Sequence, residues 1–571
     1  MIKKIRINKN KKKRLVTAAL PYINNIPHLG HIVGSHLPAD IFARYSRTAG
    51  YDTIFVGGTD ENGSTSEIAA SKIGVDIKIF SNKLHEEHAK IYRWFGISYD
   101  IFSRTSKSIH YKTVQDFFKK IYNNGFIDEG MMKVFYSSEE DMFLPDRYIV
   151  GECPICGYKD ANGDQCEKCT TILDPMQLIN PRSNISGGKV EIKNSKHLFI
   201  RLDKLSPELE KWIKTQDKWR RPVINLAKSW IKEGLKPRAI TRDLKHGVPV
   251  PLKGYKNKVF YVWFDAPIGY VSATKEITKN WKEFWGENSE IYNFLGKDNI
   301  PFHTIFWPAI LIGQKEFNLP TNVIGLQYLN YEGGKFSKSK ERGVFCEKLP
   351  NGQLNSDIWR AYLTQIIPET SDSEFKWGEF KERINSDIIG NLGNFVNRTI
   401  SFVDSKLKKT VQKYKETSTK IDDEFKEIVK NKVKEITSNL ESAEIRKGFS
   451  KILALSTEGN KYLTKTTPWK LLKTEPKRAN EILSNCIGLV RTLAIIISPY
   501  LPLSSQKIWE QLNLTGKCNT PGNWNKAYDI SISSKHKINK ADKLFIMITE
   551  EDIEKIRKET SKPTNLPKLF N

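Results

Sequence analysis

The sequence has few cysteines and no long apolar run. Only 7 of its 571 residues are cysteine. So few cysteines in so long a chain argue against a disulfide scaffold and indicate a reducing compartment. The best apolar segment, 487–503, is interrupted by Arg491 and Pro499, whereas a membrane-spanning helix needs about 18 continuous apolar residues. We therefore expect a cytoplasmic protein with no membrane partner.

The N-terminal residues lack acidic groups and an apolar signal core. The first 14 residues contain eight basic side chains and no acid. Because a secretion signal requires an apolar core, we do not expect secretion. We predict a disordered basic leader over residues 1–13, with a transit peptide as the alternative.

Acidic residues are outnumbered by basic ones. The 91 Lys and Arg residues against 65 Asp and Glu residues give a net charge of +26. This charge fits a polyanionic partner such as RNA. It equally fits a lysine-rich composition without functional meaning. A hydrophobic content of 39% and a charged content of 27% are typical of a soluble globular protein.

The first part of the chain has an α/β pattern. Short apolar runs at 15–20 and 53–56 flank an amphipathic stretch at 32–49, which predicts a βαβ unit and a parallel sheet. The pattern returns in three later segments, at 259–264, 304–312 and 321–324.

The last part of the chain has a helical period. From about residue 386, apolar residues recur every three to four positions, which predicts a helical bundle. The predicted helices are 388–411, 421–440, 445–462, 479–498 and 504–512. The predicted segments are a leader (1–13), an α/β half-domain (14–117), an insertion (118–245), a second half-domain (246–330), a loop and linker (331–385), the bundle (386–540) and a C-terminal segment (541–571).

Two motifs predict a nucleotidyl-transfer site. His28-Leu29-Gly30-His31 follows the first apolar run and a turn rich in Pro and Asn. A strand, a loop and a helix N-terminus in this order are where α/β folds bind phosphate. The second motif, Lys335-Phe336-Ser337-Lys338-Ser339, follows two glycines that give its loop backbone freedom.

Four of the cysteines form two close pairs, Cys153/Cys156 and Cys166/Cys169, nine residues apart. Two such pairs suit a closed tetrahedral zinc site. A redox role is the alternative for a single CxxC pair. Because four thiolates leave no open coordination position, we expect one structural Zn²⁺.

With these motifs, the chain resembles the methionyl-tRNA synthetases, which are class I aminoacyl-tRNA synthetases, from residue 14 to about residue 556. Order and spacing agree across all the stretches that carry the resemblance. They are Ala19-Leu20-Pro21-Tyr22, His28–His31, Asp60-Glu61-Asn62-Gly63, the cysteine pairs, 263–270, Phe302-His303, 306–309 and Lys335–Ser339.

The resemblance implies a fold and an activity. The fold would be a Rossmann-type catalytic domain with a zinc-bearing insertion, followed by an α-helical anticodon-binding domain. The enzyme would activate L-methionine with ATP, accompanied by Mg²⁺, to methionyl-adenylate and pyrophosphate. It would then transfer methionine to the 3′ end of tRNA(Met).

The resemblance also assigns roles to residues. The catalytic groups would be His28, His31, Lys335 and Lys338. ATP would bind to these four residues together with Gly30, Gly325, Ser337 and Ser339. Methionine would bind to Leu20, Tyr22, Asp60, Trp263, Ala266, Pro267, Tyr270 and His303. The metal ligands would be Cys153, Cys156, Cys166 and Cys169, and the anticodon would bind to Asn394, Arg398 and Trp469.

The chain departs from the family pattern at three positions. Leu29 and Phe336 replace commoner residues, and we expect neither to contact the site. Ile324 stands where histidine is common before Gly325, which leaves the adenine contact open. We expect 544–548 to be the family's strand that docks on the catalytic core. Because the appended tRNA-binding domain of some members is absent, a monomer is expected.

Three other functions fit parts of the sequence less well. A catalytically silent tRNA-binding paralogue would not need both the His and the Lys pairs. A class I synthetase for a branched aliphatic amino acid would carry an editing insertion of several hundred residues. A small nucleotidyltransferase would need neither the cysteine pairs nor the bundle.

Overall fold

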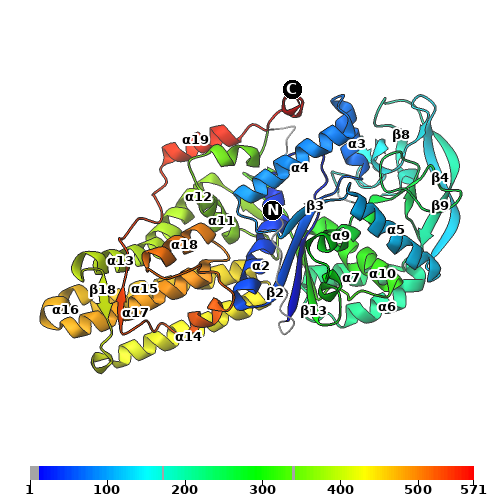
Figure 1. Ribbon diagram of the computed structural model, residues 1–571. Coiled ribbons are helices and arrows are strands. Elements are labelled where there is room, and N and C mark those ends of the chain that lie inside the picture. Colours follow the sequence, from blue (N-terminus) through cyan, green and yellow to red (C-terminus); the bar gives the residue numbers. More distant parts are fainter. Residues whose placement is uncertain (1–11, 170, 172, 337–340, 571) are drawn as a thin grey trace.

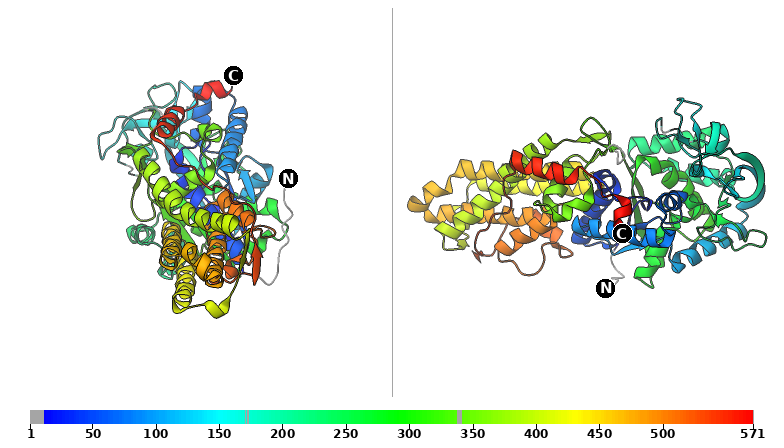
Figure 2. Two further views of the ribbon diagram at one scale, coloured as in Figure 1. Left: turned by 90° about the vertical axis from the view of Figure 1, so that its left-hand side faces the viewer. Right: turned by 90° about the horizontal axis from the view of Figure 1, so that it is seen from above.

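The computed structural model describes residues 12–169, 171, 173–336 and 341–570. A parallel sheet lies at the centre of an elongated molecule, with the helical bundle at one end and the insertion at the other (Figures 1 and 2).

The central sheet has five parallel strands in the order β14-β13-β1-β2-β3. Their bounds are β1 (Lys13–Ala18), β2 (Asp52–Thr59), β3 (Ile101–Arg104), β13 (Ser289–Gly296) and β14 (Asn322–Leu326). Every residue of β1 is buried, as expected for a parallel sheet covered on both faces. Because the strands are parallel, the residues that follow them gather at one edge, where such folds bind ligands.

The helices around this sheet are mostly short. They are α1 (Leu29–His31), α2 (Leu37–Ala49), α3 (Ser64–Lys72), α4 (Ile77–Trp94), α5 (Ser108–Asn123), α8 (Val262–Asp265), α9 (Ile268–Ile277) and α10 (Trp307–Gln314). Two π-helical turns, η1 (Ile32–His36) and η6 (Phe302–Phe306), precede α2 and α10.

The predicted βαβ unit is confirmed, but 259–264 is not a full strand. Strand β12 (Val259–Phe260) stops after two residues, and α8 begins at Val262. A short apolar run fits a buried strand and a buried helix equally well. Strand β13, which lies between β1 and β14, was not predicted.

The insertion contains two small sheets, two helices and the strand β11, which pairs with β12 outside the insertion. Its strands are β4 (Ile127–Ser137), β5 (Met142–Phe143), β6 (Ile149–Glu152), β7 (Ala161–Asn162), β8 (Ile179–Ser183), β9 (Glu191–Ile200), β10 (Arg238–Ala239) and β11 (Thr241–Arg242). The long antiparallel pair of β4 and β9 forms its outer face (Figure 1). Helices α6 (Leu202–Lys214) and α7 (Arg221–Glu233) return the chain to the central sheet.

The linker to the bundle is a mixed segment. It comprises β15 (Leu329–Tyr331), β16 (Gly334–Lys335), α11 (Ser356–Gln365), β17 (Ser373–Phe375), α12 (Trp377–Arg383) and the π-helical η8 (Ile384–Gly393). Strand β15 pairs with both β16 and β17.

The bundle follows the predicted helical period. Its helices are α13 (Asn394–Lys406), α14 (Lys420–Glu441), α15 (Ile445–Thr466), α16 (Pro468–Thr474), α17 (Pro476–Ile497) and α18 (Pro502–Gln511), with a small ribbon of β18 (Thr410–Gln412) and β19 (Lys535–Lys537). Helix α17 is long and apolar enough to cross a membrane by length and composition, but 89% of its most apolar window is buried inside the protein.

The C-terminal segment runs back from the bundle to the catalytic region through α19 (Glu550–Thr560) (Figure 2). The predicted strand at 544–548 is wrong, because these residues form no strand. The side-chain amide of Asn385 instead binds both the N–H and the carbonyl of Ile548, at 3.0 and 2.8 Å. Near its end the chain stacks Phe570 on Phe80 of α4.

Candidate active site

The first motif lies in the segment that leads from β1 into α2. His28 is the N-cap of α1, and its Nδ1 accepts a hydrogen bond from the backbone N–H of Gly30 at 3.0 Å. The Nδ1 of His31 accepts from the backbone N–H of His28 at 3.2 Å. A ring nitrogen that accepts from an N–H carries no proton, so the proton of each neutral ring lies on Nε2. Both imidazoles are therefore set as Nε2–H donors, which suits phosphate oxygens.

Two features fix the start of this helix. A Cβ at residue 30 would lie 2.7 Å from Cε1 of His28, so glycine lets the imidazole fold over the backbone. In the π-helical turn that follows, His36 is held between the hydroxyls of Tyr92 and Tyr99, at 3.0 and 2.5 Å. Burial lowers the pKa of His36, so this supporting ring is neutral.

The second motif contacts the first through Phe336. The Phe336 ring stacks on the imidazole of His28, with centroids 4.7 Å apart and planes inclined by 4°. The expectation that Phe336 does not contact the site is therefore wrong. The contact joins two segments that are far apart in the sequence, so motif spacing alone does not reveal it.

Two of the other predicted ATP-binding residues lie on described strands, Lys335 on β16 and Gly325 on β14. Lys335 ends β16 and pairs with Asn330, and its ammonium is 5.7 Å from the ring centre of Tyr328. Gly325 lies near the end of β14, where a Cβ would be 2.7 Å from Cδ1 of Ile300. Ser337, Lys338 and Ser339 lie outside the described residues, and their roles stay predictions.

Asp60 follows β2 and is 3% exposed. Its backbone N–H donates to Pro21 and its carbonyl accepts from Ile23, at 2.9 and 3.1 Å. Burial, followed by the negative charges of Asp265 and Glu61, raises the pKa of Asp60 well above its ordinary value. Oδ1 of Asp60 has no hydrogen-bond partner among the described residues. A buried carboxylate with a raised pKa and an oxygen without a hydrogen-bond partner among the described residues is suited to binding a cationic ligand.

Neighbouring polar groups hold the segment that carries Asp60. Nε of Arg104 donates to both carboxylate oxygens of Glu61 at 2.9 Å. The amide of Asn62 donates to Asp265 at 2.7 Å. Arg104 and Asp265 were not predicted from the sequence. The pairing of β2 with β3, which the sequence alone does not give, brings Glu61 and Arg104 together.

His303 and Tyr270 form a neutral wall beside Asp60. Nδ1 of His303 is 3.0 Å from the carbonyl of Asn299, so it carries the proton, and Nε2 accepts from the hydroxyl of Tyr270 at 2.9 Å. Burial lowers the pKa of His303 to about 4. Trp263 packs edge-on against Phe306 at 5.4 Å. This wall is aromatic and uncharged at neutral pH, which suits an apolar ligand group.

The carboxylate and the aromatic wall belong to one site. Burial, followed by the negative charge of Asp60, raises the pKa of both Tyr22 and Tyr270. The indole of Trp263 donates to the hydroxyl of Tyr22 and so lowers the pKa of Tyr22, against the larger effects. Leu20 contacts the start of α9, because a Cβ added at Gly269 would lie 2.9 Å from Cδ1 of Leu20. The predicted residues Ala266 and Pro267 are buried in the turn between α8 and α9.

The insertion reaches this site through Arg147, which was not predicted. Nε of Arg147 donates to Asp164 at 2.9 Å, and Asp164 lies between the two cysteine pairs. The charge of Arg147 lowers the pKa of Tyr22, against the larger effects of burial and Asp60. The ion pair of Arg147 and Asp164 thus lies close enough to Tyr22 for its charge to act on that hydroxyl.

The four cysteines converge as the sequence predicts. The Sγ atoms of Cys153 and Cys169 are 3.8 Å apart, those of Cys156 and Cys166 are 3.6 Å apart, and all four lie within 4.8 Å of one another. Thiolates about 2.3 Å from a tetrahedral metal would be about 3.8 Å from each other. The cluster therefore fits a metal ion without an open coordination position.

Arg398 and Trp469 meet at a cavity in the bundle. The guanidinium carbon of Arg398 lies 5.6 Å from the ring centre of Trp469. The cavity, of about 290 Å³, is lined by Arg398, Ser401, Phe402, Ser405, Leu463, Pro468, Trp469 and Leu483. The four residues from α13 have the spacing of one helix face, a signal present in the sequence. Asn394 is not part of this lining and donates to Asn460 at 3.2 Å.

Comparisons with known proteins agree with this geometry. The family model of class I tRNA synthetases (M) matches residues 14–400, and that of the anticodon binding domain of methionyl tRNA ligase matches residues 414–563. The cytoplasmic methionine–tRNA ligase of Saccharomyces cerevisiae is 40% identical over 559 residues, covering 96% of this chain and 73% of the relative. Methionine–tRNA ligase 1 of Acaryochloris marina is 42% identical over 509 residues, covering 88% of this chain and 91% of the relative.

A solved structure has the same fold. The Mycobacterium tuberculosis methionyl-tRNA synthetase in complex with methionyl-adenylate is 23% identical and has a TM-score of 0.77, covering 94% of this chain and 99% of that chain. The chain belongs to the methionyl family of class I tRNA synthetases.

Proposed function

We propose that this chain is a methionine–tRNA ligase, which activates L-methionine with ATP and transfers it to the 3′ end of tRNA(Met). The observation that carries the proposal is the buried carboxylate of Asp60, whose Oδ1 has no hydrogen-bond partner among the described residues, beside a neutral aromatic wall and two Nε2–H imidazoles. Together these groups match the ammonium, the thioether and the reacting phosphate of methionine activation.

Methionine would bind through its two ends. Asp60 would pair with the ammonium, with Leu20 and Tyr22 beside it. The thioether would lie against Trp263 and the pair of Tyr270 and His303, because aromatic surfaces suit a polarizable sulfur. Ala266 and Pro267 would shape the same slot.

Adenylate formation would depend on positioning and electrostatics. A carboxylate oxygen of methionine attacks the α-phosphorus, the bond to the β-phosphate breaks, and pyrophosphate leaves. The Nε2–H groups of His28 and His31 would stabilise the charge that develops on the α-phosphate. Lys335 and Lys338 would neutralise the leaving pyrophosphate, and Mg²⁺ bound with ATP would supply further positive charge. Gly30, Gly325, Ser337 and Ser339 would complete the ATP site.

The cavity at Arg398 would bind a single-stranded anticodon base. An aromatic ring beside a guanidinium can stack and hydrogen-bond such a base. The cavity borders α16, which lies at the end of the bundle farthest from the central sheet (Figure 1), and tRNA is long enough to span this separation. Asn394, which shares a helix face with Arg398 and donates to Asn460, would also contact the anticodon.

Pyrophosphate exchange tests the proposed activity. With each of the twenty amino acids and labelled pyrophosphate, we expect ATP–pyrophosphate exchange only with methionine. An apolar pocket discriminates against near-sized analogues by only about 10- to 200-fold, so weak exchange with such analogues is compatible with the proposal. Exchange with leucine or cysteine in place of methionine would contradict it.

The cysteine cluster gives a second prediction. We propose one structural Zn²⁺ per chain, bound by Cys153, Cys156, Cys166 and Cys169, and elemental analysis of freshly purified protein measures it. Cys166→Ser should remove the metal and, through Asp164 and Arg147, raise the KM for methionine more than the KM for ATP. Cys346→Ser changes a buried cysteine outside the cluster and should keep the zinc. Zinc-free active wild type would contradict the prediction.

A monomeric state and a cytoplasmic location are part of the same proposal. The location is supported by the relative from Saccharomyces cerevisiae, which is the cytoplasmic methionine–tRNA ligase of that organism. Sedimentation equilibrium should give the mass of a single chain. A dimer at micromolar concentration would contradict the monomer.

A further inference from the structure

The shortest helix of the bundle carries the exposed ring of Trp469. Helix α16 (Pro468–Thr474) has seven residues, and so short a helix has little stability of its own. It begins at a strained turn, because Thr467 has φ 40° and ψ 56°. A β-branched residue in the left-handed region, directly before a proline, persists only when its surroundings enforce it. Something must therefore hold the two helices that flank this turn.

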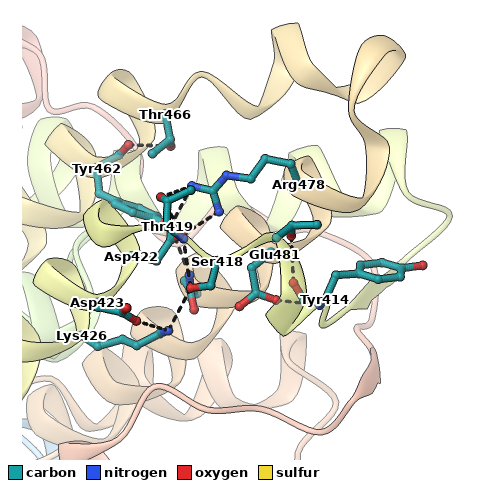
Figure 3. Close-up of polar contacts among 12 residues, drawn as sticks. Tyr414, Ser418, Thr419, Asp422, Asp423, Lys426, Tyr462, Thr466, Arg478 and Glu481 are labelled. Atoms are coloured by element: carbon teal, nitrogen blue, oxygen red, sulfur yellow. Dashed lines mark hydrogen bonds and ion pairs between the residues drawn. The ribbon is translucent and has the colours of Figure 1, made fainter.

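A buried carboxylate joins α15 to α17, the helices that lie before and after this turn and α16 in the chain (Figure 3). Asp422, whose side chain is fully buried, accepts two bonds from Arg478 of α17, at 2.6 and 3.0 Å. It also accepts a bond from the hydroxyl of Tyr462 in α15. The backbone N–H and the hydroxyl of Thr419, the N-cap of α14, donate to it at 2.7 and 3.1 Å. One side chain thus fixes three helix ends.

The anchored residues are adjacent to the walls of the Trp469 cavity. Tyr462 directly precedes Leu463, and both Leu463 and Leu483 line the cavity. The hydroxyl of Tyr462 accepts a bond from Asn485 at 3.1 Å, and Asn485 lies two residues after Leu483. The Tyr462 ring is stacked on Phe425 at 4.0 Å. A shift of this cluster would move both apolar walls and the turn before α16.

The charges of the cluster are well compensated. Burial alone would raise the pKa of Asp422, but Arg478, Tyr462 and Thr419 hold it below its ordinary value. The carboxylate is therefore ionised at neutral pH. Removing its charge would leave Arg478 without its buried partner, which is more disruptive than the loss of one hydrogen bond.

We propose that Asp422, acting through Tyr462 and Arg478, is a positioning residue that holds Trp469 and its cavity in the arrangement that binds a single-stranded base of tRNA. The inference rests on the proposed function and extends it to residues that do not line the cavity. It separates recognition of tRNA in the bundle from methionine activation, which takes place beside the central sheet.

Asp422→Asn tests this role, and the adjacent residue gives a matched control. We expect the KM for tRNA in aminoacylation to rise about tenfold, as for loss of one charge-assisted interaction, with methionine-dependent exchange unchanged. Asp423→Asn removes an exposed carboxylate that pairs only with Lys426 among the described residues and should change neither. An unchanged KM for tRNA in Asp422→Asn would overturn the proposal.

A double-mutant cycle distinguishes positioning from general stabilisation. If Asp422 acts through the ring, Asp422→Asn should weaken tRNA binding much less in a Trp469→Ala background than in the wild type. Fully additive losses would overturn the proposal. Should Asp422→Asn fail to fold, Tyr462→Phe removes only one hydroxyl and serves in the same cycle. A wild type without methionine-dependent exchange would instead refute the proposed function.

Discussion

Asp60→Asn should lower kcat/KM for methionine about 10²- to 10³-fold, as expected when one partner of a buried charge pair is lost. Asparagine keeps the shape of the side chain but leaves the methionine ammonium without its counter-charge. ATP–pyrophosphate exchange at varied methionine concentration measures the effect. The KM for ATP should change little, because the imidazole pair of the first motif is intact.

The pH dependence of exchange identifies the same carboxylate. Burial and the nearby Asp265 raise the pKa of Asp60 in the free enzyme, so at low pH Asp60 is protonated and cannot pair with the ammonium. Wild-type kcat/KM for methionine should therefore rise with pH through this pKa. Asp60→Asn should lack this rise of kcat/KM with pH. Asp265→Asn should move the rise to lower pH, because it removes a negative charge that raises the pKa of Asp60. An identical rise in Asp60→Asn would assign the titration to another group.

The same shift has a consequence for stability. Asp60 has its ordinary pKa in the unfolded chain and a raised pKa in the folded protein. At pH values between these two, the folded protein binds more protons than the unfolded chain. Asp60 therefore destabilises the folded state increasingly as the pH rises through this window. Urea unfolding measures this effect. At pH values above the folded pKa of Asp60, the free energy of unfolding of Asp60→Asn should exceed that of the wild type, and at pH values below the unfolded pKa this difference should disappear. The site thus retains a destabilising charge that its ligand needs.

The sequence predicts the parts of this molecule that depend on local patterns. The period of the apolar residues identifies α14, α15 and α17, because an amphipathic helix carries its own signal. The two CxxC pairs predict a metal cluster because their spacing nearly determines how the thiolates meet. The motif at His28 predicts a phosphate site from a strand, a loop and a helix start.

Contacts between distant segments are not predictable in this way. The pairing of Arg104 with Glu61 arises from the order of strands in the central sheet, and the stacking of Phe336 on His28 arises where the strands β15 and β16 meet α1. One sequence gives neither arrangement. Strand β13 pairs on one side with β14, the next strand along the chain, and on the other with β1, which is distant in sequence. The irregular backbone around Ile548 is set by one amide, that of Asn385, which replaces a strand partner.

Arg360→Met should destabilise the protein by about 3–5 kcal/mol, the range found when a buried ion pair loses one partner. Arg360 of α11 is fully buried and forms an ion pair with Asp40 of α2 at 2.8 Å. Its other donors bind the carbonyls of Phe95, Pro499 and Tyr500 at 3.0, 2.7 and 2.6 Å. One guanidinium therefore joins the catalytic region to the loop after α17, and its removal leaves three buried carbonyls without this donor.

Urea unfolding measures this loss, with Arg221→Met as the control, because Arg221 is an exposed arginine at the start of α7. Its effect should stay within about 0.5 kcal/mol. Asp40 keeps its contacts with Arg44 and Ser98, so the loss in Arg360→Met comes mainly from the junction. Aminoacylation should then fall more than pyrophosphate exchange, because only tRNA must contact both the bundle and the catalytic site. A loss below 1 kcal/mol would show that apolar packing alone holds the two parts together.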